Sequence, residues 1–267
     1  MSKVIGIAGM GWLGMPLAQR LKLLGFQVKG SVTRLDKASQ LQRSGFDVYP
    51  MTISEEGVSG SYKAFLKELD ILIILIPPGL RRNTGSDYVL KISHLLSEME
   101  AAKIPKCIFI SSTSVYGDSQ GTVTEKDIPM PESEAGRQLF QVEQLLFNSE
   151  VKTTILRFGG LYGGNRQPVK YLAGRENLNG GKAPVNLIHR DDCIAIIFEI
   201  IKQDSFGNIF NAVHPEHPMK QDYYTAKASE LGLDPPSYVN SEEGEKFKKV
   251  DSINLKKLLT YSFSQPL

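Results

Sequence analysis

One short motif near the start of the chain limits the possible folds more than any other feature. An apolar segment, residues 3–8, leads into Gly9-Met10-Gly11-Trp12-Leu13-Gly14, and leucines at helical spacing follow over residues 15–25. A second strand-like segment, residues 26–32, comes next. The order strand, glycine turn, helix and strand is the context in which a G-x-G-x-x-G motif binds a dinucleotide. The first glycine permits the tight turn, the second lets a pyrophosphate approach the backbone, and the third lets the helix pack on the strand. We therefore expect all six residues of the motif to bind a dinucleotide at the positive end of the helix.

The end of the second strand bears on which dinucleotide is bound. Its last residues run Ser31-Val32-Thr33-Arg34, and the first acidic residue after them is Asp36. Sites for NAD place an acidic side chain near this point, whereas an arginine accommodates the 2′-phosphate of NADP. Thr33 and Arg34 are therefore predicted to contact the cofactor, and NADP is favoured over NAD. The alternative, that Arg34 is a surface arginine of a loop, stays open.

Two further strands are predicted to complete the cofactor site. Residues 70–76 are expected to form a strand, because residues 71–76 are an unbroken apolar run, which is typical of a central parallel strand covered on both faces. The run ends abruptly, at the sheet edge where ligands of such folds bind, and three residues there are predicted to contact the cofactor: Ile76, Pro77 and Pro78. Residues 106–110 form the next strand, and Ser111 after it is predicted to lie beside the cofactor. The fold class predicted is α/β, a Rossmann-type doubly wound parallel sheet with a smaller C-terminal substrate lobe.

The hydroxyl groups after this strand are candidates for catalysis. The chain reads Ser111-Ser112-Thr113-Ser114-Val115-Tyr116-Gly117. Hydroxyls at the carboxyl end of a strand can donate hydrogen bonds to a substrate oxygen, and a phenol can exchange a proton. Ser112, Thr113 and Tyr116 are the candidates, although serine and threonine are also common in loops and caps.

Composition excludes several classes of function. The chain has 267 residues, enough for one large domain with a smaller lobe, and its net charge of +2 comes with no basic stripe that would favour nucleic acid. The longest apolar run is too short to span a bilayer. The four histidines show no metal-ligand spacing, so no metal is expected. Cys107 and Cys193 lie in apolar segments and are expected to be free thiols in a reducing cytoplasm.

Five segments in order resemble one family. They are the glycine motif, residues 110–117 (ISSTSVYG), residues 156–163 (LRFGGLYG), residues 186–192 (NLIHRDD) and residues 207–211 (GNIFN). Together they resemble the extended short-chain dehydrogenase/reductases, the NAD-dependent epimerase/dehydratase group. The resemblance implies an NAD(P)-binding Rossmann domain over residues 1–163, with 186–213 returning to it. Residues 164–185 and 214–267 would form a small lobe that closes over a nucleotide-sugar-like or other small substrate, and two copies would pair as a homodimer.

The resemblance fails at one place. Family enzymes carry a Tyr and, four residues later, a Lys whose charge lowers the phenol pKa. Ala135 and Leu139 occupy these two positions here, the pattern of atypical members of the family. Other groups considered for the proton transfer are Tyr116, Tyr162, Arg137 and Glu143. By resemblance Arg157 lies behind the site, and Tyr162 and Arg166 are the expected substrate contacts.

Three functions therefore compete. The first is an atypical NAD(P)-dependent epimerase, dehydratase or oxidoreductase. The second is a cofactor-binding regulator or sensor without turnover, which the missing pair favours. The third is a β-hydroxyacid dehydrogenase, whose opening sequence is similar and which requires an all-helical second half. Parallel strands continuing to residue 213 would exclude the third.

Some expectations concern the lobe and its surroundings. A third strand is expected at residues 46–49, with a polar connection from residue 55 to a helix. Residues 168–179 are expected to form a lobe helix, and Asp191 or Asp192 to cap a helix over residues 193–202. The last helix, residues 253–259, is expected to belong to the lobe.

Overall fold

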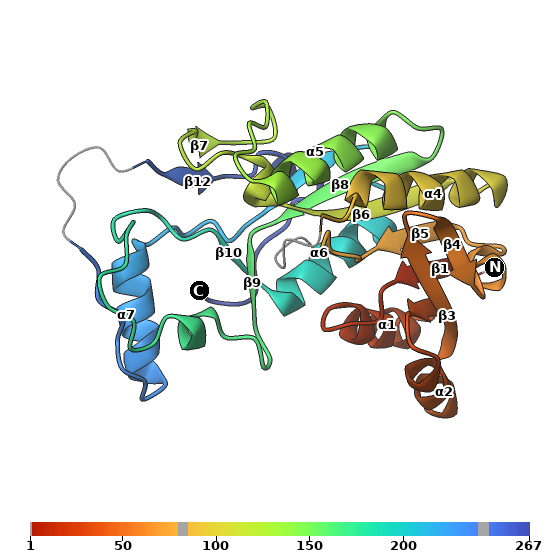
Figure 1. The fold of residues 1–267 in the computed structure, drawn as a ribbon, viewed down its shortest axis with the longest axis horizontal. Helices are drawn as coiled ribbons and strands as arrows, with labels where there is room; N and C mark the ends of the chain where they lie inside the picture. The colour runs from red at the N-terminus through yellow and green to blue at the C-terminus, as the bar shows by residue number, and fades with distance from the viewer. Residues whose placement is uncertain (1, 80–84, 240–245) are drawn as a thin grey trace.

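The computed structural model describes residues 2–79, 85–239 and 246–267 and is built on one eight-stranded sheet (Figure 1). The strand order is β11-β8-β6-β5-β1-β2-β3-β4, and every neighbouring pair is parallel except the β3–β4 hairpin. The strands are β1 (Val4–Ala8), β2 (Gln27–Val32), β3 (Asp47–Ser54), β4 (Gly57–Gly60), β5 (Ile71–Ile74), β6 (Lys106–Ser112), β8 (Lys152–Phe158) and β11 (Ile209–Ala212). The chain winds outward from β1 in one direction through β3 and then returns to β5 on the other side of β1. In folds of this kind, ligands bind at the carboxyl ends of the strands where such a reversal occurs, here β1 and β5, and the predicted doubly wound Rossmann-type sheet is confirmed.

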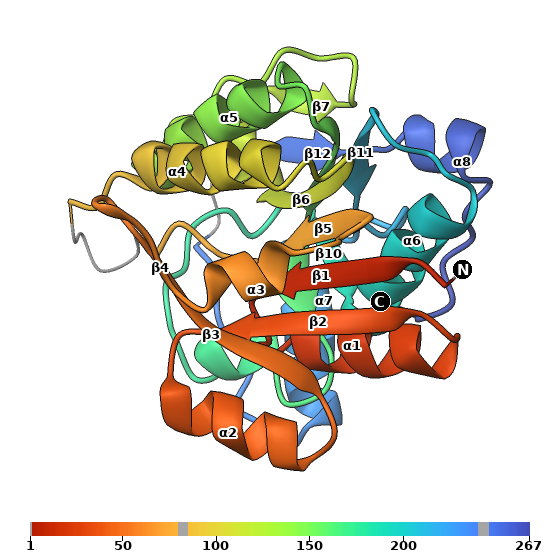
Figure 2. The ribbon, with the colours of Figure 1, turned by 90° about the vertical axis from the view of Figure 1, so that its right-hand side faces the viewer.

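Helices cover both faces of the sheet, as Figure 2 shows. One face packs against α1 (Gly14–Leu23), α2 (Leu35–Arg43), α6 (Arg190–Lys202) and α8 (Asn254–Leu258), and the other against α3 (Tyr62–Leu66), α4 (Tyr88–Ala101) and α5 (Glu134–Phe147). Each strand contributes side chains to both cores, because successive side chains of a strand point to opposite faces of the sheet. Ile71 and Ile73 join the first core, whereas Leu72 and Ile74 join the second.

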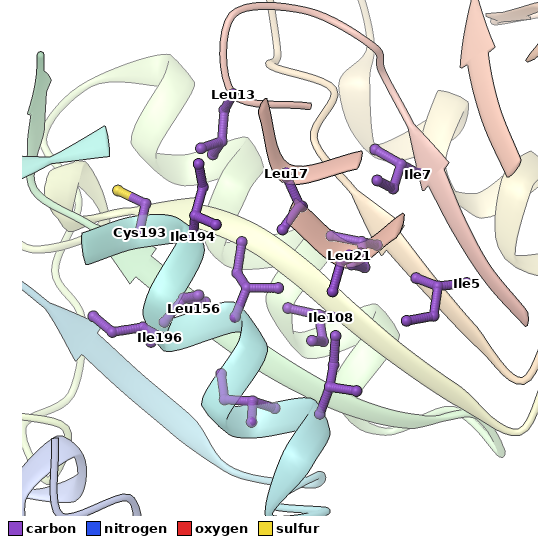
Figure 3. Close-up of a cluster of buried hydrophobic side chains, with 14 of the residues drawn as sticks. Ile5, Ile7, Leu13, Leu17, Leu21, Ile108, Leu156, Cys193, Ile194 and Ile196 are labelled. Atoms are coloured by element: carbon purple, nitrogen blue, oxygen red, sulfur yellow. The ribbon is translucent and has the colours of Figure 1, made fainter. Parts of the chain in front are cut away.

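The first core is shown in Figure 3, where leucines of α1 lie opposite isoleucines of α6 over the sheet. Leu17 and Leu21 are fully buried there, at the helical spacing seen in the sequence. Cys193 lies in this core and Cys107 in the other, and both are free thiols. Burial raises the pKa of each thiol well above its ordinary value, so both stay protonated and unreactive.

A smaller lobe lies at one end of the sheet, with the C-terminus beside it (Figure 1). Strand β9 (Gly160–Tyr162) pairs with β10 (Leu187–His189), and α7 (Lys220–Glu230) packs near the short 3₁₀ helix η3 (Pro168–Tyr171). Its core is small: Tyr162, Val185 and Leu187 are buried, with Tyr223, Tyr224 and Leu267 packed against them. A second small pair, β7 (Gly121–Val123) with β12 (Lys248–Val250), lies beside α5 (Figure 1). The division of the chain into a Rossmann domain and a lobe at the stated residues stays a prediction.

Several local expectations were wrong. Residues 168–179 contain only the four residues of η3, because the backbone of the following segment bonds elsewhere: Gly174 N–H donates to Asp234 O and Leu178 N–H to Ser237 O. The third strand extends to Ser54 and turns back as β4, where only a polar connection was expected.

Two further expectations were wrong near the C-terminal half of the sheet. Helix α6 is capped by the ring nitrogen of His189, which accepts from Asp191 N–H, so neither Asp191 nor Asp192 is the cap. Helix α8 packs against β11, and its Leu255 lies in the core of the sheet and not in the core of the lobe.

The topology also decides between fold families. Parallel strands continue through β8 and β11, up to Ala212. A β-hydroxyacid dehydrogenase would be all-helical in this half, so the third hypothesis is wrong. Among the described helices, none combines the length and the apolar character needed to cross a membrane.

Candidate functional site

The glycine motif forms a tight turn between β1 and α1. Gly9 has a φ of +111°, a conformation that favours glycine. A Cβ on Gly14 would overlap the carbonyl oxygen of Gly9, so only glycine lets the first residue of α1 approach the turn this closely. The turn is anchored to β2, because Met10 N–H donates to Ser31 O at 2.9 Å. Two of the three glycines are therefore required by the turn itself.

The middle of the motif is open and fits a pyrophosphate. Gly11 is exposed, and a Cβ placed there would have no atom within 4 Å. Within the described residues, the backbone N–H groups of Trp12 and Leu13 have no hydrogen-bond acceptor. Helix α1 has no side-chain cap and no acid in its first turn. Free N–H groups at the positive end of a helix form an anion site.

Two cations follow β2, Arg34 just before α2 and Lys37 in its first turn. Thr33 and Arg34 are exposed, and Arg34 is paired with Asp36: its Nε lies 3.0 Å from Oδ1, and Nη2 also contacts Oδ2. This pairing lowers the pKa of Asp36 to about 2. Lys37 was missed by the sequence reasoning; its Nζ donates to the carbonyl oxygen of Met10 at 2.8 Å. Lys37 was missed because a lysine in a helical segment does not indicate which remote carbonyl it will reach.

The segment after β5 lies next to the glycine turn, as expected. Leu75 N–H donates to Ala8 O at 2.9 Å, and Leu75 is the nearest neighbour of Gly9. The carbonyl oxygen of Ile76 accepts from the buried Tyr88 hydroxyl at 2.6 Å, which holds the chain at this edge. Pro77 is exposed and Pro78 half-buried beyond it. The structure thus brings Leu75 against the motif, and the contacts of Ile76, Pro77 and Pro78 with a cofactor stay a prediction.

The serines of β6 point in different directions. The strand extends to Ser112, two residues beyond its predicted end. Ser111 is buried, and its hydroxyl donates to Glu143 Oε1 at 2.5 Å, so its side chain is unavailable to a cofactor. The Oγ of Ser112 accepts from Ser114 N–H at 3.1 Å, and among the described residues its own proton has no acceptor. Ser112 can therefore donate to a ligand. Thr113 is buried in the 3₁₀ helix η2 (Thr113–Val115).

Tyr116 belongs to a buried network and is not available to a ligand, which corrects the prediction. Its hydroxyl donates towards Thr124 O at 2.8 Å and Asn211 Oδ1 at 3.1 Å and accepts from Arg157 Nη1 at 2.6 Å. Burial raises the pKa of this phenol. With its hydrogen-bonding capacity used inside the protein and 1% of its surface exposed, Tyr116 cannot exchange a proton with a substrate.

The same network excludes Glu143 as an acid or base. Arg157 and Glu143 form a two-pronged ion pair, with Nη2 to Oε2 at 2.6 Å and Nε to Oε1 at 3.0 Å. Both side chains are 3% exposed. Arg157 lies behind the site, as the resemblance implies, and joins α5 to β8.

The two positions of the missing catalytic pair are structural. Leu139 is buried in the core between α5 and the sheet, and Ala135 is half-buried in the first turn of α5. A Cβ on the intervening Gly136 would overlap Ser114 O, so this turn packs directly on η2. Arg137, on the other side of the helix, is exposed and bonded to Glu134 and Glu132.

The two predicted substrate contacts, Tyr162 and Arg166, differ in their surroundings: Tyr162 is buried, whereas Arg166 lies near the glycine motif. Tyr162 is 8% exposed, and its hydroxyl donates to Pro266 O at 2.6 Å, so the prediction that it contacts substrate is wrong. Burial raises the pKa of Tyr162 to about 12. Arg166 lies over the ring of Trp12, with its guanidinium carbon 5.5 Å from the ring centre. Arg190, which the sequence reasoning missed, lies 5.4 Å from the same ring centre. Its place in the motif IHRDD gave no sign of this contact.

Potential metal ligands are scattered in the part of the chain that the structure describes. No group of three or more His, Cys, Asp or Glu side chains gathers there in a form that could hold an ion.

Comparisons with known proteins agree on the fold and the cofactor class. A family pattern described as NAD(P)H-binding matches residues 9–204. Protein YeeZ of Escherichia coli strain K12 is 37% identical over 99% of this chain and 97% of its own length.

Solved structures are also similar. UDP-N-acetylglucosamine 4-epimerase from Bacillus cereus superposes with a TM-score of 0.78 at 18% identity, over 99% of this chain and 95% of that one. A short-chain dehydrogenase/reductase superfamily protein from Agrobacterium tumefaciens with bound NAD gives 0.78 at 17% identity, over 98% and 93%.

The motif glycines give a matched pair of predictions. Gly11→Ala places a methyl group in open space, so we expect an unchanged melting temperature. The methyl group would occupy space that a pyrophosphate needs, so NAD(P)H should bind about tenfold more weakly, a loss of ~1.4 kcal/mol. Gly14→Ala forces the helix away from the turn and should destabilise the protein by about 1–3 kcal/mol. Thermal unfolding and calorimetry measure the two effects. Equal loss of stability in both variants would contradict the open cradle at Gly11.

The buried ion pair gives a second prediction. Glu143→Ala leaves Arg157 charged and unpaired, which should lower the free energy of unfolding by about 3–5 kcal/mol. The double change Glu143→Leu with Arg157→Met removes both charges and should cost much less than the sum of the single changes. Urea unfolding measures the coupling. Additive effects of the two single substitutions would show that the pair does not act as a unit.

Proposed function

We propose that this chain, which belongs to the NAD(P)H-binding family and is an atypical short-chain dehydrogenase/reductase of the epimerase/dehydratase type, binds NADP(H) along the carboxyl edge of the sheet. There it acts on a nucleotide-sugar-like or other small carbonyl or hydroxyl substrate, without the usual Tyr–Lys pair. One observation carries the proposal: an open glycine turn after β1 and a serine with a free hydroxyl proton after β6 lie on the same edge, separated by β5 alone.

The choice of NADP rests on charge at the end of β2. No acidic residue ends this strand, and the exposed residues that follow it are Thr33 and Arg34. In dinucleotide-binding folds an acidic residue near this point favours NAD and an arginine favours NADP, which supports NADP here. Asp36 holds the Arg34 guanidinium through two of its nitrogen atoms, which leaves its remaining N–H groups for a phosphate. Lys37 adds a second positive charge beside Met10. The arrangement supports a preference for the more anionic cofactor.

Ser112 supplies the contact with the substrate. A bound nicotinamide cofactor supplies hydride transfer. Ser112 would hold the reacting oxygen of the substrate by donating a hydrogen bond from its hydroxyl, whose hydrogen has no acceptor among the described residues. No described phenol or carboxylate at this edge is available to exchange a proton, because Tyr116, Tyr162 and Glu143 are buried and bonded. The proton would therefore come from water or from the substrate itself. A nucleotide sugar is supported by the likeness to a UDP-N-acetylglucosamine epimerase.

A second function has its own support. The same buried phenols and the leucine at the lysine position favour a cofactor-binding regulator or sensor without turnover. The two functions share the cofactor site and differ only in whether a reaction occurs once the cofactor is bound.

We also propose a cellular compartment and an oligomeric state for the protein. The two free, buried thiols support the cytoplasm as its compartment. Pairing of two copies through α4 and α5, which pack against each other on one face of the sheet, is proposed from the resemblance.

The cofactor preference is tested with Arg34→Ala. We expect NADPH affinity to fall about tenfold while NADH affinity stays unchanged, because only NADPH presents a 2′-phosphate. Isothermal calorimetry measures both. Arg43→Ala, at the exposed end of α2, removes the same charge and should change neither affinity. If the wild-type protein binds both cofactors equally, the proposed role of Arg34 is wrong.

Turnover is tested on a panel of nucleotide sugars and small carbonyl compounds. NADPH oxidation detects net reduction, and chromatography of the products detects epimerisation or dehydration, which leave the cofactor unchanged overall. We expect slow turnover that Ser112→Ala removes and that Tyr116→Phe and Tyr162→Phe leave unchanged in folded protein. Circular dichroism and cofactor affinity serve as folding controls. Fast turnover that survives Ser112→Ala would contradict the proposed site, and tight cofactor binding with no turnover on any substrate would favour the regulator.

A further inference from the structure

Two arginines share the ring of Trp12, and neither belongs to the glycine motif. Arg166 comes from the turn after β9, and Arg190 is the first residue of α6. Their guanidinium carbons lie 5.5 and 5.4 Å from the centre of the ring. Two segments far along the chain thus contact Trp12, whose backbone N–H is one of the two proposed to bind the pyrophosphate.

The turn that carries Arg166 is tightly constrained. Gly163 and Arg166 exchange backbone hydrogen bonds at 2.9 and 3.1 Å, which closes the turn. Gly164 has a φ of +57°, and a Cβ there would lie 2.8 Å from Nη1 of Arg190. A Cβ on Gly163 would overlap the ring of His189. The two glycines thus let the backbone lie directly against Arg190 and its neighbour, which holds both arginines in place.

The charges of this pair are poorly compensated. Among the described residues, the Arg166 guanidinium has no hydrogen bond and no ion pair. Arg190 has one carboxylate nearby, Asp191, with Nε 3.6 Å from Oδ1, and that Nε is buried without an acceptor. The Nε1 of Trp12 is also buried without a partner. Like charges gathered on one ring repel, and an anion between them would remove the repulsion and use the free donors.

We propose that Arg166 and Arg190 bind a phosphate group beside the glycine turn, with Trp12 as the positioning residue that holds them there. Planar guanidinium groups match phosphate oxygens with paired donors, and they stack on an indole face. The phosphate is either the pyrophosphate of the cofactor, held from the lobe side, or a phosphate of the substrate next to it. The inference rests on the proposed function only for the choice between these two sources.

The pair is tested first with inorganic pyrophosphate alone. Trp12 is the only tryptophan of the chain, so its fluorescence reports on this site directly. We expect pyrophosphate to change the emission, and Arg166→Gln or Arg190→Gln to weaken its binding about tenfold or more and to reduce its salt dependence. Arg43→Gln is the control of equal charge. Arg190→Lys, which keeps the charge, replaces Arg190→Gln if that variant does not fold.

The source of the phosphate is tested with NADPH. A loss of NADPH affinity in Arg166→Gln and Arg190→Gln assigns the pair to the cofactor. Unchanged NADPH affinity, with pyrophosphate binding to the NADPH-saturated protein lost in both variants, assigns it to the substrate. Binding of both ligands equal to that of Arg43→Gln would overturn the proposal. Failure of NADPH to bind, with arginine-dependent pyrophosphate binding retained, would overturn the proposed function and leave the phosphate site standing.

Trp12 is tested by Trp12→Phe and Trp12→Leu. Phenylalanine keeps an aromatic face for the two arginines but lacks the indole N–H, so calorimetry should show a pyrophosphate affinity between those of the unchanged protein and of Trp12→Leu. Leucine removes the face and should reproduce the loss seen in the arginine variants. Equal affinity in both variants would show that the ring does not position the pair.

Discussion

The arrangement of the site depends on the contact between Gly14 and the carbonyl oxygen of Gly9. No side chain fits there, so α1 begins directly on the turn that ends β1. In this turn the backbone N–H groups of Trp12 and Leu13 have no acceptor among the described residues, and the turn lies where the order of the strands reverses. Trp12 lies in the same turn, and its ring is contacted by Arg166 from the turn after β9 and by Arg190 from α6. One backbone contact therefore fixes the turn that carries both the free N–H groups and Trp12.

Sequence reasoning predicted the parts of the fold that local patterns determine. Apolar runs such as residues 70–76 can be stable only between two helical layers, and a glycine motif between strand and helix has few other uses. The lobe was predicted less well, because its backbone bonds are made between distant segments, as those of Gly174 with Asp234. The same limit applies to the site. Ser112 is predicted from its place at a strand end, and its role stays a prediction. Lys37 and Arg190 contact residues 27 and 178 positions away, which no local pattern indicates.

The phenols explain why a residue type alone is a weak guide to chemistry. Tyr116 has the group needed for proton transfer, yet Arg157, Thr124 and Asn211 use its hydroxyl inside the protein. Tyr162 is likewise bonded to Pro266. The ion pair of Arg157 with Glu143 also holds the hydroxyl of Ser111, so these buried groups join α5 to β6 and β8 and take no part in ligand binding themselves. What a polar side chain can do in a folded protein depends on which of its hydrogen bonds remain unused.

The two cysteines have a consequence for how the protein can be studied. Cys107 and Cys193 lie in the cores on opposite faces of the sheet, and their thiols stay protonated while the layers are packed. A thiol-specific dye can modify either one only after the helices on that face separate from the strands. Labelling with such a dye and then mapping the modified peptides would time the opening of each layer separately. The protein thus carries a built-in reporter of unfolding on each side of its sheet.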